Sequence, residues 1–350
     1  INEIALLIGN TPQKEKQNIF DNLKTNKIKC LIGTHALLED PVVFKDLQIA
    51  IIDEQHRFGV NQRNTLKSKG ENLHLLVMSA TPIPRSLALT VYGDLDVSVM
   101  DEMPPGRKPV NTILLNHSER KKAYKLISEQ IQNGFQAFIV YPMIDSDDDG
   151  NNEELYKSAV KEHKRIKKDV FPNYTVGLLH GKLKQACKDE IMDDFRNQKY
   201  DVLISTTVIE VGVDVPDATI VLIESANHFG LAQLHQIRGR VGRNMENAYC
   251  ILIPDSDNAI ENERLVAMTK SNDGFKLAEI DLNYRGPGEF LGTRQSGYAG
   301  FKFANISDIK LIETSRKYAQ DIIRDDSELT HPDHSMLKEQ LLYFWPDINN

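Results

Sequence analysis

The feature that most constrains the fold is a short apolar run that stops at two adjacent carboxylates. Residues 47–52 read Leu-Gln-Ile-Ala-Ile-Ile, and Asp53 and Glu54 follow at once. The run is too short for a buried helix and rich in β-branched side chains, which is typical of a strand in a parallel sheet. Ligands of open α/β sheets bind beyond the carboxyl ends of such strands. We therefore expect an α/β fold with a ligand close to Asp53 and Glu54.

Two neighbouring carboxylates repel each other, so their position favours something that they bind. A magnesium ion on a nucleotide and a water about to attack it would account for both. The structural alternative is an acidic turn at the end of a strand, which is the commoner explanation for an isolated Asp-Glu pair.

Length and composition describe an ordinary globular protein. The 350 residues allow two domains and a smaller third, and 41% of them are hydrophobic. No secretory signal or membrane-length apolar run occurs, so we expect a cytoplasmic protein and no membrane partner. Cys30, Cys187 and Cys250 lack paired spacing, which argues against a zinc site or a disulfide framework. The net charge of -8 by itself predicts no DNA binding, although a local basic groove remains compatible with it.

Apolar runs alternate with helical stretches along most of the chain. The strands expected before residue 100 are 4–8, 28–32, 47–52 and 73–78, and a helix is expected over 12–23. Three prolines and a glycine within 102–109 predict a linker. Later strands are expected at 110–115, 137–141, 175–179, 202–205, 220–223 and 249–253, and helices at 118–132, 153–167, 184–195, 232–238, 307–318 and 336–344. The alternation predicts two α/β units, each with a parallel sheet and helices on its faces.

Two short polar segments follow expected strands of the first unit. Gly33, Thr34 and His35 open the segment after the second strand, where backbone N–H groups at a helix start suit a DNA phosphate. The alternative is that Thr34 only caps a helix. Ser79 and Thr81 follow the fourth strand, and their hydroxyls could hydrogen-bond the Glu54 or Gln55 region and sense the nucleotide. An ordinary strand-to-helix turn is the alternative.

The densest cluster of polar residues lies in the second unit. Arg238, Arg240 and Arg243 fall within six residues and are interleaved with two glycines. Three arginines make a poor core, and the guanidinium fork suits phosphate oxygens, so we expect an anion beside them. A solvated basic turn is the alternative. Upstream groups that could meet a ribose or a nucleic-acid backbone are Thr206, Thr207, Glu210 and Asp214.

These motifs together resemble a known class of enzymes. Asp-Glu-Gln-His at 53–56, Ser-Ala-Thr at 79–81 and Gln-x-x-Gly-Arg-x-Gly-Arg at 236–243 resemble helicase motifs II, III and VI of superfamily 2, in order. Residues 33–35 resemble motif Ib, and residues 206–214 resemble motif V. The RecG family of branched-DNA translocases is the closer match, through 53–60, 79–85, 104–109 and 179–183. Residues 273–297 resemble the translocation motif that RecG shares with the coupling factor Mfd, so the resemblance covers nearly the whole chain.

The resemblance implies a fold and an activity. The fold would be two RecA-like parallel-sheet domains, the first truncated, followed by a helical-hairpin translocation element. The activity would be ATP-dependent remodelling of branched DNA, in replication fork regression and Holliday junction processing. ATP and Mg²⁺ would be the cofactors, and a single-stranded DNA-binding protein is suggested as a further partner.

The resemblance also implies roles for individual residues. Asp53 would coordinate magnesium through water, Glu54 would orient the attacking water, and Arg240 and Arg243 would reach the γ-phosphate from the second domain. The residues implied in nucleotide binding or coupling are Gln55, His56, Ser79, Thr81, Asp214 and Gln236. Those implied in DNA binding are Gly33, Thr34, His35, Thr206 and Thr207, and those of the translocation loop are Arg285, Arg294 and Gln295.

One departure from the family pattern is important. No Gly-x-x-x-x-Gly-Lys-Ser/Thr phosphate loop occurs in the sequence. We expect that loop, and the wedge domain of the family, to precede residue 1, and this chain alone to be inactive as an ATPase. The expected domains are 1–103, a linker at 104–109, 110–256, 257–300 with the hairpin and translocation loop, and a helical extension at 301–350.

Two other functions remain open at this stage. One is duplex translocation of the Mfd type, against which His56 and the Pro-Pro-Gly-Arg-Lys-Pro linker favour RecG. The other is a nucleic-acid-binding module without catalysis, which the absent phosphate loop supports and the intact Asp53, Glu54, Arg240 and Arg243 oppose.

Overall fold

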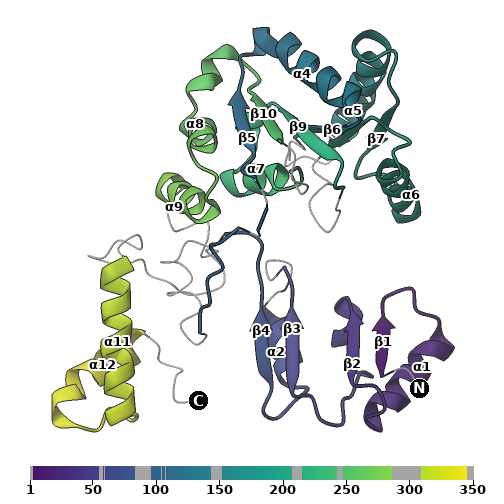
Figure 1. Ribbon diagram of the computed structural model, residues 1–350. Coiled ribbons are helices and arrows are strands. Elements are labelled where there is room, and N and C mark those ends of the chain that lie inside the picture. Colours follow the sequence, from purple (N-terminus) through teal and green to yellow (C-terminus); the bar gives the residue numbers. More distant parts are fainter. Residues whose placement is uncertain are drawn as a thin grey trace. The chain divides into compact units, whose positions relative to one another are not determined.

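The computed structural model describes residues 3–54, 58, 60–82, 96–103, 105–106, 108–142, 152–206, 215–242, 247–285 and 309–344. The chain divides into two compact units, Ile1–Thr81 and Pro82–Asn350 (Figure 1). The domain boundaries proposed from the sequence stay predictions.

The first unit contains two pairs of parallel strands. The helix α1 (Gln13–Lys24) joins the paired strands β1 (Ile4–Leu7) and β2 (Cys30–Gly33). After the short helix η1 (His35–Leu38), β3 (Ile49–Ile52) pairs with β4 (His74–Val77), and α2 (Val60–Lys67) lies between them in the sequence. The expected parallel strands are present, and in the described residues they form two separate two-stranded sheets, β1-β2 and β3-β4.

Each strand pair of the first unit packs on its own small cluster. Leu7, Ile19 and Phe20 belong to the cluster beside β1 and β2, whereas Ala50, Ile52 and Leu66 form the one beside β3 and β4. Alternate residues of the strands face solvent. Ile49 and Ile51 are 60% and 59% exposed, although parallel sheets normally have both faces covered.

The second unit is built on a six-stranded parallel sheet in the order β5-β10-β9-β6-β8-β7. The six strands expected from the sequence are confirmed, with small shifts at their ends. They are β5 (Asn111–Leu114), β6 (Gln136–Tyr141), β7 (Val176–Leu179), β8 (Val202–Thr206), β9 (Ala218–Glu224) and β10 (Tyr249–Ile253). Because all six run the same way, their carboxyl ends share one edge of the sheet.

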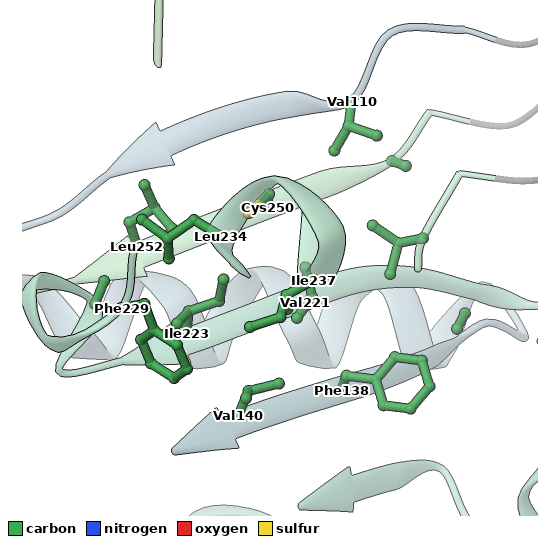
Figure 2. Packing of buried hydrophobic residues seen from close by; sticks show 14 of the residues in the cluster. Val110, Phe138, Val140, Val221, Ile223, Phe229, Leu234, Ile237, Cys250 and Leu252 are labelled. Carbon is green, nitrogen blue, oxygen red and sulfur yellow. The ribbon is translucent and has the colours of Figure 1, made fainter. Parts of the chain in front are cut away.

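Helices cover both faces of this sheet, and alternate strand residues enter two separate cores. Phe138, Val221 and Leu252 belong to one core, and Ile139, Ile220 and Ile251 belong to the other. Figure 2 shows the first core, with Leu234 and Ile237 packed over the strands. The period of two residues puts neighbouring apolar side chains on opposite faces. The apolar runs of these strands are therefore almost unbroken.

The helices of this unit follow the expected order. They are α4 (Arg120–Gln132) after η3 (His117–Glu119), α5 (Asn152–Arg165) with the π-helix η4 (Ile166–Val170), α6 (Gln185–Arg196) and α7 (Leu231–Arg238) after η6 (Ala226–His228). After η7 (Asp257–Glu261), α8 (Glu263–Lys270) and α9 (Gly274–Arg285) are joined by three residues. The terminal helices are α11 (Ile309–Asp325) and α12 (Ser335–Phe344), with η8 (Pro332–His334) between them. Within the described residues, no helix has the length and apolar character needed to cross a membrane.

Candidate nucleotide and nucleic-acid site

Asp53 and Glu54 lie where the sequence places them, directly after β3. Asp53 is exposed, and its Oδ1 accepts a hydrogen bond of 2.8 Å from the backbone N–H of Glu54. Glu54 has φ 51°, a left-handed conformation that side-chain-bearing residues rarely adopt. Backbone strain of this kind, about 1–3 kcal/mol, concentrates at functional sites. A ligand at this strand end stays a prediction, because four other non-glycine residues of the described chain also have positive φ.

The segment after β2 is built around glycine and an aromatic stack. A Cβ added to Gly33 would lie 2.1 Å from the carbonyl oxygen of Leu7, so this position requires glycine for packing. Thr34 precedes η1 but makes no side-chain cap, which is against the capping alternative. The ring of His35 stacks on Phe58 with centroids 5.0 Å apart and an interplanar angle of 13°. The stack joins the segment after β2 to the segment that follows Asp53 and Glu54.

Ser79 and Thr81 pair with each other. Their hydroxyl oxygens are 2.6 Å apart, and the hydroxyl of Ser79 also lies 3.2 Å from the carbonyl oxygen of Thr81. Within the described part of the first unit, no hydrogen bond joins either hydroxyl to Glu54. Gln55, the other expected partner, lies outside the described residues, so the contact with this region and a role in sensing nucleotide stay predictions.

In the second unit, Thr206 lies at the carboxyl end of β8. Its hydroxyl oxygen is buried and has no hydrogen-bond partner among the described residues. Buried polar groups are normally hydrogen-bonded, so an orphan hydroxyl at this edge is a candidate ligand contact.

A buried ion pair lies on the same edge of the sheet, at the end of β9. Glu224 is 3% exposed and accepts from both Nε (2.9 Å) and Nη2 (2.8 Å) of Arg120. Burial opposes the charge on Arg120, but the hydrogen bonds and charge of Glu224 outweigh it, so the pKa of Arg120 is raised. The pair fixes the start of α4 to the end of β9.

The motif that follows β9 contains a buried arginine. Arg238 is 3% exposed and donates through Nη1 to the carbonyl oxygens of Met268 (3.0 Å) and Ser271 (2.8 Å), and through Nη2 to His235 Nδ1 (2.8 Å). Its burial lowers its pKa. The expectation of an anion beside all three arginines is wrong for Arg238, because carbonyl groups at the end of α8 satisfy its donors.

Two polar residues of this motif stay partly accessible. Gln236 and Arg240 are half-buried on and just after α7. Gly242 has φ 74°, and an added Cβ would lie 2.8 Å from the Cβ of Ala248, so glycine is required here. The turn therefore holds Arg240 at the end of α7 by close backbone packing.

Several residues singled out in the sequence lie outside the described residues. They are Gln55, His56, Thr207, Glu210, Asp214, Arg243, Arg294 and Gln295. Arg285 is the last residue of α9. Their roles stay predictions.

Sequence reasoning missed three residues that organise these edges: Phe58, Arg120 and Glu224. Glu224 carried a usable signal, because it ends an apolar strand as Asp53 does. Phe58 and Arg120 carried no such signal. Their partners, His35 and Glu224, are distant in the sequence, and Arg120 stands at the start of an ordinary helix.

The residues present fit an outer-sphere magnesium site. The described residues include no group of three or more His, Cys, Asp or Glu side chains that could hold a metal directly. Magnesium in nucleotide sites usually keeps several waters and uses one or two carboxylates together with phosphate oxygens. Asp53, exposed at a strand end, suits that arrangement.

The chain matches three families of helicase sequences. Residues 2–90 match the DEAD/DEAH box helicase family, residues 119–245 match the helicase conserved C-terminal domain, and residues 271–345 match the C-terminal part of domain 3 of ATP-dependent DNA helicase RecG. The ATP-dependent DNA helicase RecG of Thermotoga maritima is 51% identical over 327 residues, which are 93% of this chain and 41% of that protein. This chain belongs to the RecG family.

Other RecG proteins and solved structures agree. The RecG of Bacillus subtilis is 42% identical over 341 residues, 97% of this chain and 49% of that protein. A structure of RecG bound to a three-way DNA junction superposes with a TM-score of 0.67 at 49% identity, over 89% of this chain and 39% of that chain. The chain thus spans less than half the length of these relatives. The DUF1998 helicase MrfA, at 17% identity and a TM-score of 0.55 over 75% of this chain and 40% of its own, shares the fold.

Proposed function

We propose that this chain carries motor residues of an ATP-dependent DNA helicase that remodels branched DNA in recombination and repair. The observation that carries the proposal is the pair Asp53 and Glu54 at the carboxyl end of β3, with Glu54 held at φ 51°. Relatives at 42% and 51% identity bear the name ATP-dependent DNA helicase RecG, and a related RecG structure holds a three-way DNA junction.

ATP and Mg²⁺ are the proposed cofactors. Magnesium supplies positive charge that neutralises phosphate oxygens during phosphoryl transfer. Asp53 would hold it through water. The Oδ1 of Asp53 already accepts from the N–H of Glu54, so Oδ2 is the oxygen left for that water. The Glu54 carboxylate would orient and deprotonate the attacking water, and its left-handed backbone sets the direction of its side chain.

The arginine motif is proposed to bind nucleotide phosphate through Arg240 and Arg243, with Gln236 and Asp214 as further contacts. Gln55, His56, Ser79 and Thr81 are proposed to couple nucleotide state to DNA. Arginines in this role are worth roughly 10³–10⁵ in rate in phosphoryl-transfer enzymes. The buried Arg238 positions the helix that precedes Arg240 and takes no part in phosphate binding.

We further propose that a segment outside this chain supplies the phosphate loop. The sequence contains no such loop, and the chain spans 41% and 49% of two relatives. In the first unit, Ile49 and Ile51 of β3 are exposed on a face that a parallel sheet would normally cover. On this proposal the chain alone does not hydrolyse ATP.

DNA is proposed to contact the two strand-end segments and the translocation loop. After β2, Thr34 and His35 are exposed. At the end of β8, the hydroxyl oxygen of Thr206 is buried and has no hydrogen-bond partner among the described residues. Gly33 shapes the first segment by packing, and Thr207, Arg285, Arg294 and Gln295 complete the proposed set. Branched DNA is the proposed substrate, a single-stranded DNA-binding protein a further partner, and the cytoplasm the proposed place of action.

The test compares ATP turnover in the presence of three-way junction DNA and linear duplex, with and without the upstream segment. We expect turnover only with that segment, with strong stimulation by the junction. The Glu54→Gln variant should lose turnover but keep nucleotide binding, because it removes the base and keeps the shape. Glu71→Gln, an exposed carboxylate of the same unit, is the matched control and should be unaffected.

Three other outcomes would redirect the proposal. Equal stimulation by linear duplex would favour an Mfd-type duplex translocase. Absence of any stimulation in the extended protein would leave a nucleic-acid-binding module. Turnover by the 350-residue chain alone that depends on Glu54 would show that no further segment is needed.

A further inference from the structure

A row of lysines lies on the helix before β7, away from every motif discussed above. Residues 161–168 contain five Lys and Arg residues and a single Glu, within a chain of net charge -8. Lys161 and Lys164 lie three residues apart on α5, the spacing that aligns side chains on one face of an α-helix, and Lys168 follows four residues later in the π-helix η4. With Lys167, they form what we call the α5 lysine row, and all four are exposed.

The lysines of the row make no ion pair with a carboxylate that the structure describes. Among the described residues, none of the four lysines takes part in an ion pair, and Asp169 is the adjacent acidic residue. Glu162 is occupied by Arg165, whose Nη2 lies 2.7 Å from its Oε2. Other lysines of the second unit differ. Lys122 pairs with Glu119, Lys125 with Glu129, and Lys199 with Asp194.

The backbone beneath the row is held firmly. Ile166 is fully buried and Phe171 is 1% exposed, and both belong to the core on one face of the sheet. The backbone N–H of Phe171 donates to the carbonyl of Ile166, which closes the π-helical turn that carries Lys167 and Lys168. Single π-helical turns are rare and frequently occur at functional sites. Rigid anchoring presents the lysines as a preformed surface.

The row lies at the edge of the sheet opposite the strand ends that carry Thr206 and Glu224. The π-helix ends five residues before β7 begins, and the ring of His163 lies 3.1 Å from the carbonyl oxygen of Val176, the first residue of β7. Figure 1 shows α5 beside β7. Since all strands are parallel, the row lies at their amino ends. A ligand on the row would therefore be separate from one at the carboxyl edge.

We propose that the α5 lysine row binds the phosphate backbone of a second segment of duplex DNA, in addition to the duplex at the carboxyl edge. The proposal rests on the proposed function for the identity of the polyanion. Lysine acts as a point charge for phosphate without base readout, so binding would be independent of sequence. From Lys161 to Lys168 the row spans about 10 Å of helix, long enough for roughly three phosphate contacts. A branched substrate has a second arm to offer, and a linear duplex bound at the other edge does not.

The test is DNA binding by the full-length protein at about 50 mM and 200 mM salt. The row variant is Lys161→Ala, Lys164→Ala, Lys168→Ala. The matched control, Lys122→Ala, Lys125→Ala, Lys199→Ala, removes the same charge from lysines that already have carboxylate partners. We expect the row variant to bind a three-way junction at least about tenfold more weakly at the lower salt. The slope of log K against log salt should fall in magnitude by about 3, because each of roughly three lost phosphate contacts contributes about 0.9 to it. The control should change affinity less than about twofold.

The outcomes separate this inference from the proposed function. Equal weakening in the row variant and the control, or no weakening in either, would overturn the lysine row. Weaker binding of polyglutamate with unchanged binding of DNA would also overturn it, because the row would then dock an acidic protein. Absence of junction binding by the unmodified protein would instead overturn the proposed function. Basal ATP turnover should be the same in all three proteins, which confirms that the variants fold.

Discussion

Arg238 and Arg240 lie two residues apart in the sequence but in different surroundings. Arg238 is 3% exposed and is satisfied by carbonyl groups of Met268 and Ser271, whereas Arg240 is half-buried. Arg238 is the last residue of α7 and faces the end of α8, whereas Arg240 lies beyond the helix in the turn that follows. One arginine of the motif therefore builds the structure, and the next is placed for a ligand.

The first prediction concerns Arg238. Arg238→Met should lower the free energy of unfolding by at least about 2 kcal/mol, since the buried carbonyl group of Met268 and the partly buried one of Ser271 lose their donor. The control is Arg196→Met, which breaks an exposed pair with Asp193 and should cost less than about 1 kcal/mol. Chemical denaturation of both variants measures the difference. Equal losses would show that Arg238 contributes no more than a surface residue.

The second prediction concerns Gly33. Gly33→Ala should cost about 1–3 kcal/mol, because the new Cβ would lie 2.1 Å from the carbonyl oxygen of Leu7. Gly134→Ala is the control for glycine in general, with φ 86° and no atom within 4 Å of the added Cβ. It should show backbone strain alone, about 1–2 kcal/mol. Hydrogen exchange of β1 and β2 should rise only in Gly33→Ala. If that variant instead keeps its protection and loses only DNA binding, Gly33 serves the ligand directly.

At the scale of single elements, the connection between α11 and α12 is organised by one carboxylate. Asp326 accepts hydrogen bonds from the backbone N–H groups of Thr330 (2.8 Å) and His331 (2.9 Å) and from Nδ1 of His334 (2.8 Å). The hydrogen bond from His334, followed by those from the backbone, holds the pKa of Asp326 well below its usual value. The charged form of Asp326 is thus the one that orders this turn.

The sign of the pH dependence follows from that shift. Asp326 has a lower pKa folded than unfolded, so its stabilisation is fully present above the unfolded value, about 3.9, and is lost as pH falls toward the folded value. The protection factors of the Thr330 and His331 amides against hydrogen exchange should therefore fall below about pH 4. Asp326→Asn should show fast exchange already at neutral pH, with little further change on acidification. Unchanged protection in Asp326→Asn would exclude this role.

At the scale of the whole molecule, the two units differ in how completely their sheets are covered. In β9 every residue is buried, and the six-stranded sheet has a core on each face. In the first unit, exposed and buried residues alternate along β3, and the clusters are small. Local stability follows the buried apolar contacts, so the two units should open independently and at different free energies.

Native-state hydrogen exchange tests this difference. Amides of β6, β8 and β9 should exchange only with opening of the second unit, whereas those of β1 to β4 should exchange at least about tenfold faster. Addition of the upstream segment should slow exchange in β3 and β4 and leave β9 unchanged. Equal protection in both units of the 350-residue chain would contradict the difference in coverage.

Much of the fold could be predicted because apolar periodicity reports burial. The ten strands within the described residues, and most helices there, lie close to the predicted ranges, since almost unbroken apolar runs of four to seven residues leave few alternatives to a buried strand. The split of the first sheet was not predicted. Strand pairing depends on which strands are neighbours in space, and the pattern of a single strand does not contain that information.

The candidate site was predicted in its residue types and less well in its contacts. Asp53, Glu54, Gly33 and Gln236 stand where the sequence placed them, at strand and helix ends. The internal pairing of Ser79 with Thr81, the burial of Arg238 and the Arg120–Glu224 pair were not foreseen. Each depends on the direction of a side chain, which residue spacing alone does not specify.

The sequence by itself determined the α/β class, the order of the strands along the chain and the position of the carboxylate pair after β3. It could do so because these properties are local, set by residues within a few positions of each other. Only the tertiary structure decided which polar groups are used for packing and which stay available. Arg238 donates to carbonyl groups at the end of α8, whereas the lysines of the α5 row make no ion pair within the described part of the chain. Those outcomes depend on groups that are distant along the chain and meet only when it folds.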